Sequence, residues 1–162
     1  MSTIVNPIPA PFHSLTPAIN VNGGAAAIEF YQRAFGAVER YRMAMPDGSV
    51  MHAELMIGDS VIMLSDENPQ WGNLSAKTLG GSPVTLFLYV PDCDAVFAQA
   101  VAAGATVAMP VSNQFWGDRT GTVLDPFGLK WMIGTHVEGL TPEEIAARAK
   151  DFMSGAKGCA ES

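Results

Sequence analysis

The chain has 162 residues, of which 48% are hydrophobic, and it carries a formal net charge of −7. This acidic balance argues against nucleic acid and against an anionic membrane as partners, and it is compatible with a cationic or neutral ligand. No apolar run approaches the roughly 18 residues of a membrane-spanning helix, so the composition predicts one globular unit with a sizeable core.

The first fifteen residues contain neither a basic region nor an apolar stretch free of proline, so they do not form a secretory signal. Pro7, Pro9 and Pro11 favour an extended arm over residues 1–15. Cys93 and Cys159 lack the CxxC spacing, and two unrelated cysteines are typical of a reducing compartment. We therefore expect a cytoplasmic protein without a disulfide framework.

The same order of strands and helices is predicted twice along the chain. In the first half, hydrophobic periodicity predicts strands over residues 17–22, 38–45, 50–57 and 60–65, and a helix over 25–35 that ends at Gly36. In the second half it predicts strands over residues 84–90, 105–109, 119–125 and 129–134, and a helix over 92–103. Thr16 and Thr85 lie 69 residues apart, and so do Met63 and Met132. The sequence thus predicts two βαβββ repeats, over about 16–66 and 84–134.

The segment between the repeats and the segment after them differ in character. Residues 66–83 are rich in proline and glycine and exceed the usual loop length, so they form either a linker or a lid. Thr141 and Glu144 form a capping box with Pro142 at the first helical position, which predicts a surface helix over 141–153. The chain is therefore divided into an arm (1–15), one domain of two repeats (16–137), and a C-terminal helix with its tail (138–162).

Several motifs in these elements resemble a known family. They are AFGA at residues 34–37, HAELMIGDSVIMLSDE at 52–67, and GDRTGTVLDPFGLKWMIGTHVEGLTPEEIAAR at 117–148. With them the chain, over residues 14–153, resembles the vicinal oxygen chelate superfamily, in its glyoxalase/bleomycin resistance/dioxygenase group and the PhnB-like branch. The resemblance implies an α+β fold in which two βαβββ modules form an eight-stranded cup around one cavity, here with an added C-terminal helix. It also implies that the cup is completed in a homodimer.

The resemblance further implies where a divalent metal would be held, on the first and fourth strands of each module. The matching positions in this chain are Thr16, Met63, Thr85 and Met132. Hydroxyls and thioethers are poor ligands for the hard or borderline cations of these enzymes. We therefore expect neither the family metal nor another cofactor, which argues against glyoxalase, fosfomycin-transferase and extradiol-dioxygenase activity.

A displaced site is conceivable at His52 and Glu54. These residues are two apart on one strand and so share a face, where they could bind a divalent metal or act as a base with its orienting partner. The alternative is a half-exposed strand face that makes ordinary cross-strand polar pairs, and no third ligand is identified. His13 in the arm and His136 just past the last predicted strand are interpreted as structural or solvated.

Residues 114–119 form a dense polar and aromatic loop. Trp116 could stack on a planar ligand and Arg119 could clamp a carboxylate. Alternatively, Trp116 only anchors the loop and Arg119 pairs with Asp118. Trp131 and Met132 face opposite sides of their strand, which predicts Trp131 under a helix and Met132 in the cavity.

The favoured hypothesis is a metal-free protein that binds or sequesters a small molecule without chemistry. Its cavity would be lined by Thr16, Met63, Thr85, Phe87 and Met132, with polar groups at the rim. A second hypothesis is a metal-dependent lyase, isomerase or transferase that uses the displaced site around His52 and Glu54. A third is a dimeric scaffold whose cavity is closed by side chains.

Overall fold

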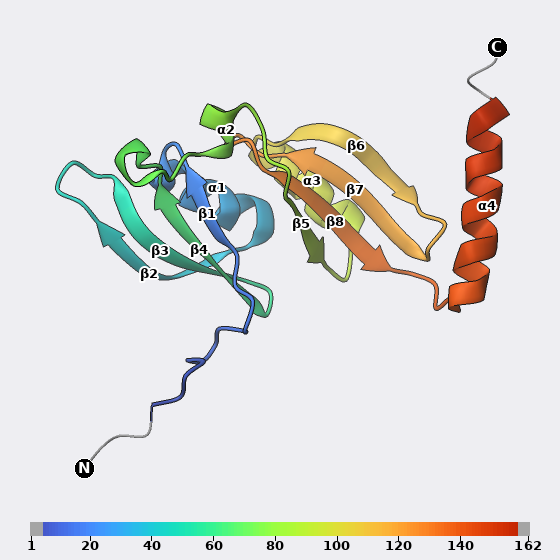
Figure 1. Cartoon of the computed structure of the whole chain (residues 1–162), viewed down its shortest axis with the longest axis horizontal. Coiled ribbons are helices and arrows are strands. Elements are labelled where there is room, and N and C mark those ends of the chain that lie inside the picture. Colours follow the sequence, from blue (N-terminus) through green and yellow to red (C-terminus); the bar gives the residue numbers. More distant parts are fainter. Residues whose placement is uncertain (1–4, 159–162) are drawn as a thin grey trace.

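The computed structural model describes residues 5–158, so Cys159 lies outside the described residues. The first module contains β1 (Ala18–Val21), α1 (Gly24–Phe35), β2 (Val38–Ala44), β3 (Val50–Ile57) and β4 (Ser60–Asp66) (Figure 1). The linker forms a 3-10 turn (Pro69–Trp71) and α2 (Ala76–Leu79). The second module contains β5 (Thr85–Tyr89), α3 (Cys93–Ala103), β6 (Thr106–Asn113), β7 (Asp118–Leu124) and β8 (Lys130–His136), and α4 (Pro142–Gly158) follows.

Each module forms its own four-stranded sheet with the same topology. The strand orders are β1-β4-β3-β2 and β5-β8-β7-β6, and in both sheets the outer pair β1–β4 or β5–β8 is parallel. Ala18 pairs with Met63 in the first sheet, and Phe87 pairs with Met132 in the second. These pairs are equivalent in the 69-residue repeat, so the predicted α+β fold of two βαβββ modules with a C-terminal helix is confirmed. β6 and β8 extend beyond the predicted residues 109 and 134, to Asn113 and His136.

The turns of the first module follow from local sequence chemistry. Gly58 has a φ of 60°, a left-handed conformation that closes the two-residue β3–β4 hairpin between Ile57 and Ser60. The Asp66 carboxylate accepts hydrogen bonds from the backbone N–H groups of Gly23, Gly24 and Val50 at 2.7–2.9 Å. Asp66 therefore joins the start of α1 to β3 and β4.

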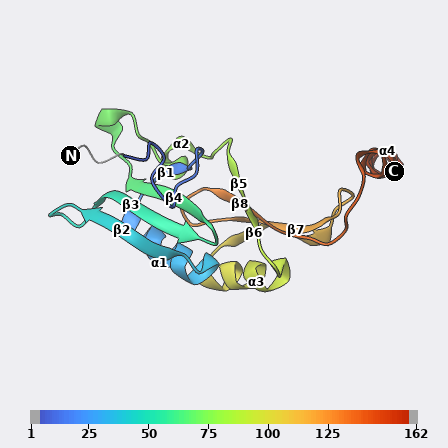
Figure 2. The same cartoon turned by 90° about the horizontal axis from the view of Figure 1, so that it is seen from below.

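Both long helices of the modules lie on the same side of the two sheets. α1 and α3 pack against each other along this side, as Figure 2 shows, whereas on the opposite side, of the described helices, only the short α2 lies near a sheet, at β1. Alternate strand residues such as Ala53, Leu55 and Leu64 are buried toward the helices. The sides of the two sheets that face away from α1 and α3 are called the open faces below.

A buried cluster around Asp125 links α1 of the first module to the second module. Tyr31 Oη and Trp131 Nε1 donate hydrogen bonds to Asp125 Oδ2 at 2.8 and 2.9 Å. The backbone N–H groups of Phe127 and Leu129 donate to Asp125 Oδ1, both at 2.9 Å. Trp131 lies on the helix-facing side of β8, as predicted. It packs on an aromatic ring of α1, with its centroid 4.5 Å from that of Phe35.

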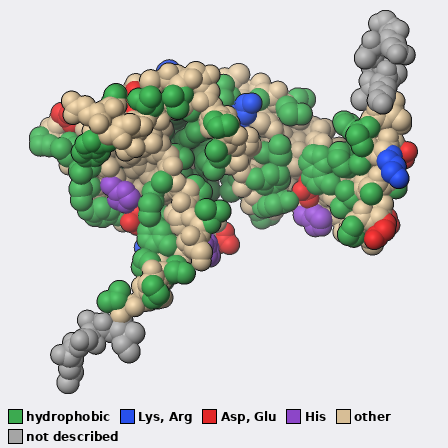
Figure 3. Space-filling model, viewed as in Figure 1, with side chains coloured by type: hydrophobic (Ala, Val, Ile, Leu, Met, Phe, Trp, Pro, Cys, Tyr) green, Lys and Arg blue, Asp and Glu red, His purple; other side chains and the backbone are tan. Residues whose placement is uncertain are grey.

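The first and last described segments extend away from the body. Residues 5–15 project beyond β1, and α4 stands apart from both sheets (Figure 1). α4 is held by the ion pair of Arg148 with Glu138, 2.8 Å apart, and further along the helix by the ring of Phe152 against that of Phe115, with centroids 5.5 Å apart. Hydrophobic side chains are exposed over both modules and near the junction with α4 (Figure 3). Within residues 5–158, none of the helices combines the length and apolar character needed to cross a membrane.

Candidate functional site

The four positions that the resemblance assigns to metal ligands lie on, or next to, the strands β1, β4, β5 and β8. Met63 and Met132 occupy equivalent places on β4 and β8, and Thr85 begins β5 beside Lys130. Thr16 precedes β1, and its hydroxyl donates to the carbonyl oxygen of His13 at 3.0 Å. Two thioethers and two hydroxyls do not fit a divalent metal ion. Among residues 5–158, no group of three or more His, Cys, Asp and Glu side chains is arranged to hold one.

His52 and Glu54 point to the open face of the first sheet. His52 Nε2 lies 3.5 Å from Glu54 Oε1, and Arg40 Nη1 donates to Glu54 Oε2 at 2.9 Å. The Arg40 guanidinium in turn lies 5.8 Å from the centroid of the Phe12 ring. Because Glu54 already forms an ion pair with Arg40, the geometry favours a cross-strand polar network over a base with a dedicated orienting carboxylate.

Arg119 forms an ion pair with an acidic residue of α3. Its Nε and Nη2 donate to the two carboxylate oxygens of Asp94 in α3, at 2.6 and 2.7 Å. Adjacent strand residues point to opposite faces, so Arg119 faces the helices while Asp118 faces the open side. The Asp118–Arg119 pair considered from the sequence does not form, and Arg119 serves the contact between β7 and α3.

Asp118 is the centre of a polar cluster that the sequence did not reveal. Its side chain is buried on the open face of β7, where Oδ2 accepts hydrogen bonds from Tyr89 Oη at 2.8 Å and from Trp116 Nε1 at 3.0 Å. His136 Nδ1 lies 2.8 Å from the other oxygen, Oδ1. The side chain of His136 is 61% exposed. The Asp118 cluster, formed by these four residues, thus combines a buried carboxylate with an accessible histidine.

The electrostatics of this cluster keep Asp118 ionised. Burial alone would raise the pKa of Asp118, but hydrogen bonds from His136, Tyr89 and Trp116 outweigh it and hold that pKa below its usual value. The same hydrogen bond to Asp118 raises the pKa of the Tyr89 hydroxyl. The cluster therefore holds one carboxylate charge and a neutral phenol near pH 7.

His136 was interpreted from the sequence as structural or solvated, since it lay just past the predicted end of the last strand. The structure extends β8 to His136 and pairs it with Asp118 across the β7–β8 hairpin. The sequence does contain a signal for this pairing, in the register of the β7–β8 hairpin. The turn after Leu124 pairs that residue with Lys130, and counting outward from this pair through an unbroken register brings Asp118 opposite His136.

A cavity of about 470 Å³ adjoins the Asp118 cluster. It follows the free edge of β5, between that strand, the β3–β4 turn and the arm, and its lining includes His13, Leu15, Phe87 and Tyr89. The rings of Phe87 and Tyr89 lie 4.4 Å apart by centroid and remain partly exposed. This β5 cavity falls in the size range of small-molecule pockets, about 300–1,000 Å³.

The residues predicted to line one central cavity are thus distributed over separate places. Phe87 lines the β5 cavity, whereas Trp116 and Met132 line a recess of about 30 Å³ on the second sheet. Met63 lies on the open face of the first sheet and lines neither of them. The structure brings together Trp116 and Met132, and it connects Phe87 to Asp118 through Tyr89.

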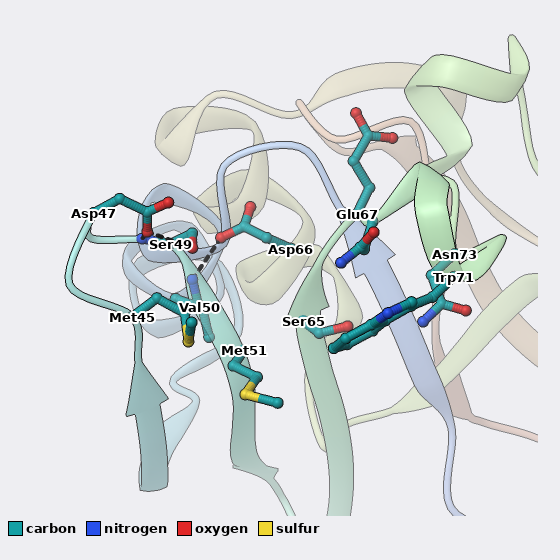
Figure 4. A pocket seen from close by; sticks show the side chains of 11 residues that line it. Met45, Asp47, Ser49, Val50, Met51, Ser65, Asp66, Glu67, Trp71 and Asn73 are labelled. Carbon is teal, nitrogen blue, oxygen red and sulfur yellow. Dashed lines mark hydrogen bonds between the residues drawn. The ribbon is translucent and has the colours of Figure 1, made fainter.

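A further cavity of about 340 Å³ lies at the end of β4 in the first module (Figure 4). Its wall includes Trp71, Met51 and three carboxylates, two of which already serve the fold. Asp66 binds backbone N–H groups, as described above. Glu67 accepts hydrogen bonds from the Ser75 backbone, from Thr78 and from Asn22, which lower its pKa to about 2. The positions of Asp66 and Glu67 are therefore explained by their structural hydrogen bonds and do not require a ligand.

This architecture is similar to that of known proteins. The family model described as the glyoxalase/bleomycin resistance protein/dioxygenase superfamily matches residues 13–133. An uncharacterised protein of Mycobacterium tuberculosis is 44% identical over 137 residues, which cover 83% of this chain and 81% of that protein. The crystal structure of an Arabidopsis thaliana gene product has a TM-score of 0.61 at 30% identity, covering 75% of this chain and 98% of that one.

Two more distant structures share the fold. TioX from Micromonospora sp. ML1 has a TM-score of 0.60 at 23% identity and covers 80% of this chain and 100% of its own. A PhnB protein from Bacillus cereus has a TM-score of 0.60 at 18% identity and covers 76% of this chain and 99% of its own. At these identities the likeness extends to the fold alone.

Proposed function

Since the chain belongs to the glyoxalase/bleomycin resistance protein/dioxygenase superfamily, we propose that it binds a small molecule in the β5 cavity. The observation that carries this proposal is the Phe87–Tyr89 ring pair in the wall of a cavity of about 470 Å³. Exposed aromatic rings provide a large apolar contact area together with a preferred stacking geometry. A small planar ligand fits this wall.

The polar groups around the cavity fit an uncharged or weakly polar ligand. The buried carboxylate of Asp118 lies behind Tyr89, and Asp59 belongs to the lining. With an overall charge of −7, the protein disfavours a ligand that arrives as an anion. Binding without a metal ion agrees with the thioethers and hydroxyls at the four family ligand positions.

The proposed functional unit is a homodimer. Large apolar side chains remain partly exposed on both open faces, among them Tyr41, Met43, Phe87 and Met109. Residues 5–15 of the arm and α4 extend from the body toward solvent (Figure 1), and α4 exposes Phe152 in its C-terminal half. Extensive exposed apolar surface is typical of a protein interaction site. A second copy, related by a twofold axis, would cover these faces and close the cavity.

The binding proposal can be tested with N-phenyl-1-naphthylamine, a neutral aromatic probe whose fluorescence rises in apolar sites. Phe87→Ala should weaken probe binding about five- to tenfold, because the stacking surface contributes roughly 1 kcal/mol and 1.4 kcal/mol corresponds to tenfold. Trp71→Ala is the matched control, an exposed aromatic of the linker that does not line the β5 cavity, and should leave the affinity within twofold. Equal losses in both variants, or no loss in Phe87→Ala, would contradict the assignment of the β5 cavity.

A further inference from the structure

The Asp118 cluster has a feature that ligand stacking alone does not require, namely a histidine oriented by a buried carboxylate. Asp118 Oδ2 is occupied by Tyr89 and Trp116, and Oδ1 faces His136 Nδ1 at 2.8 Å. An ionised carboxylate has no proton to donate. The proton in the contact with His136 is therefore on Nδ1, and the imidazole donates it to Asp118.

This assignment determines what the other ring nitrogen can do. In a neutral imidazole with a protonated Nδ1, Nε2 carries the lone pair and accepts a proton or a hydrogen bond. The His136 side chain is 61% exposed, and Nδ1 is the nitrogen that faces Asp118, which leaves Nε2 as the nitrogen for a ligand at the open face. If it takes up a proton, the resulting imidazolium is stabilised by the adjacent Asp118 carboxylate, which is the role of the carboxylate in a His–Asp pair.

The cluster is also connected to the proposed ligand site. Tyr89 lines the β5 cavity, and its hydroxyl binds the same carboxylate as His136. One carboxylate thus fixes both an aromatic wall of the cavity and the orientation of the base. The pair at His52 lacks this arrangement, since Glu54 is also held by Arg40 and its contact with His52 is 3.5 Å long.

We propose that His136 is a proton acceptor for the bound ligand, and that the ligand is a small planar compound with a weakly acidic hydroxyl, such as a phenol or a stable enol. The proton moves from the ligand O–H to Nε2, and the electron pair of that bond stays on the ligand oxygen. The products are a bound phenolate or enolate and an imidazolium paired with Asp118. This inference rests on the proposed function, because it assumes that the ligand occupies the β5 cavity.

The test uses 4-nitrophenol, whose neutral and ionised forms absorb at different wavelengths, and 4-nitroanisole, which has the same ring without the acidic proton. At a pH where free 4-nitrophenol is mostly neutral, the wild-type protein should shift the bound fraction to the phenolate spectrum. His136→Gln should abolish that shift and weaken 4-nitrophenol binding about tenfold, while 4-nitroanisole affinity stays within twofold. His52→Gln, the same change on the other sheet, should retain the phenolate spectrum.

Asp118→Asn tests the positioning role of the carboxylate. It should reduce the phenolate fraction severalfold even though His136 is still present, because the amide no longer stabilises the imidazolium. Binding of both compounds with 4-nitrophenol remaining neutral would overturn the proton-acceptor role and leave the cavity assignment standing. Loss of the phenolate signal in His52→Gln but not in His136→Gln would also overturn it. Failure of 4-nitroanisole and 4-nitrophenol alike to bind would overturn the cavity assignment together with this inference.

Discussion

The Asp125 cluster predicts a large stability loss for a change of one oxygen atom, Tyr31→Phe. The Tyr31 side chain is fully buried, and its hydroxyl donates to Asp125 Oδ2 at 2.8 Å. Hydrogen bonds to charged groups contribute about 1.5–3 kcal/mol. Because Trp131 and two backbone N–H groups still bind Asp125 in the variant, the carboxylate is not left unpaired, and we expect a loss of about 2 kcal/mol.

Chemical denaturation followed by circular dichroism measures this loss, and the chain provides its own control. Tyr41 is 47% exposed on the open face of β2, so Tyr41→Phe should change the free energy of unfolding by less than about 0.5 kcal/mol. If Tyr31→Phe costs no more than Tyr41→Phe, the hydrogen bond from Tyr31 to Asp125 does not stabilise the packing of α1 on the second module.

The same variant should change the alkaline limit of stability. Burial, followed by the charge of Asp125, raises the pKa of Tyr31 well above its ordinary value of 10.0. The folded protein then keeps this proton at a pH where the unfolded chain has lost it, so stability is fully present below about pH 10 and falls as the pH rises further. Tyr31→Phe should show a shallower decline above pH 10, and an identical pH profile would refute the linkage.

Three further changes have defined outcomes. Hydrogen bonds lower the pKa of Glu67 from 4.5 to about 2, so the wild type has stability above about pH 4.5 that it loses as the pH falls toward 2. Glu67→Gln should lack this stability. If the unfolding free energies of the two proteins follow the same acid titration profile, Glu67 does not have this role. Gly24→Ala should destabilise the protein by about 1–3 kcal/mol, since the added Cβ would lie 2.8 Å from Asp66 Oδ2 and from Val50 Cβ. This steric clash outweighs the roughly 1 kcal/mol helix preference of alanine over glycine. An unchanged or raised melting temperature would contradict the clash. If the exposed Phe152 of α4 lies in the dimer interface, Phe152→Ser should weaken self-association at least tenfold, as measured by sedimentation. A wild-type protein that is monomeric at micromolar concentration would refute the dimer itself.

The sequence by itself determined the repeated fold. Hydrophobic periodicity and the glycine turns depend on interactions between near neighbours, and they set where strands and helices begin and end along the chain. The 69-residue offset shows from the sequence alone that the same unit occurs twice. The capping box of Thr141 and Glu144 likewise fixed the start of α4, where both reciprocal hydrogen bonds form at 2.8 and 3.2 Å. The same local rule placed His52 and Glu54 on one face.

Only the tertiary structure decided which side chains share a site. Whether Asp94 or Asp118 binds Arg119 depends on how α3 packs on β7, and the link from Tyr31 to Asp125 spans 94 residues. The Asp118 cluster gathers side chains from β5, β7, β8 and a loop, so its assembly depends on the register of three strands at once. A strand that ends two residues later than its pattern predicts brings His136 to Asp118, because strand pairing, and not local propensity, sets where a strand ends.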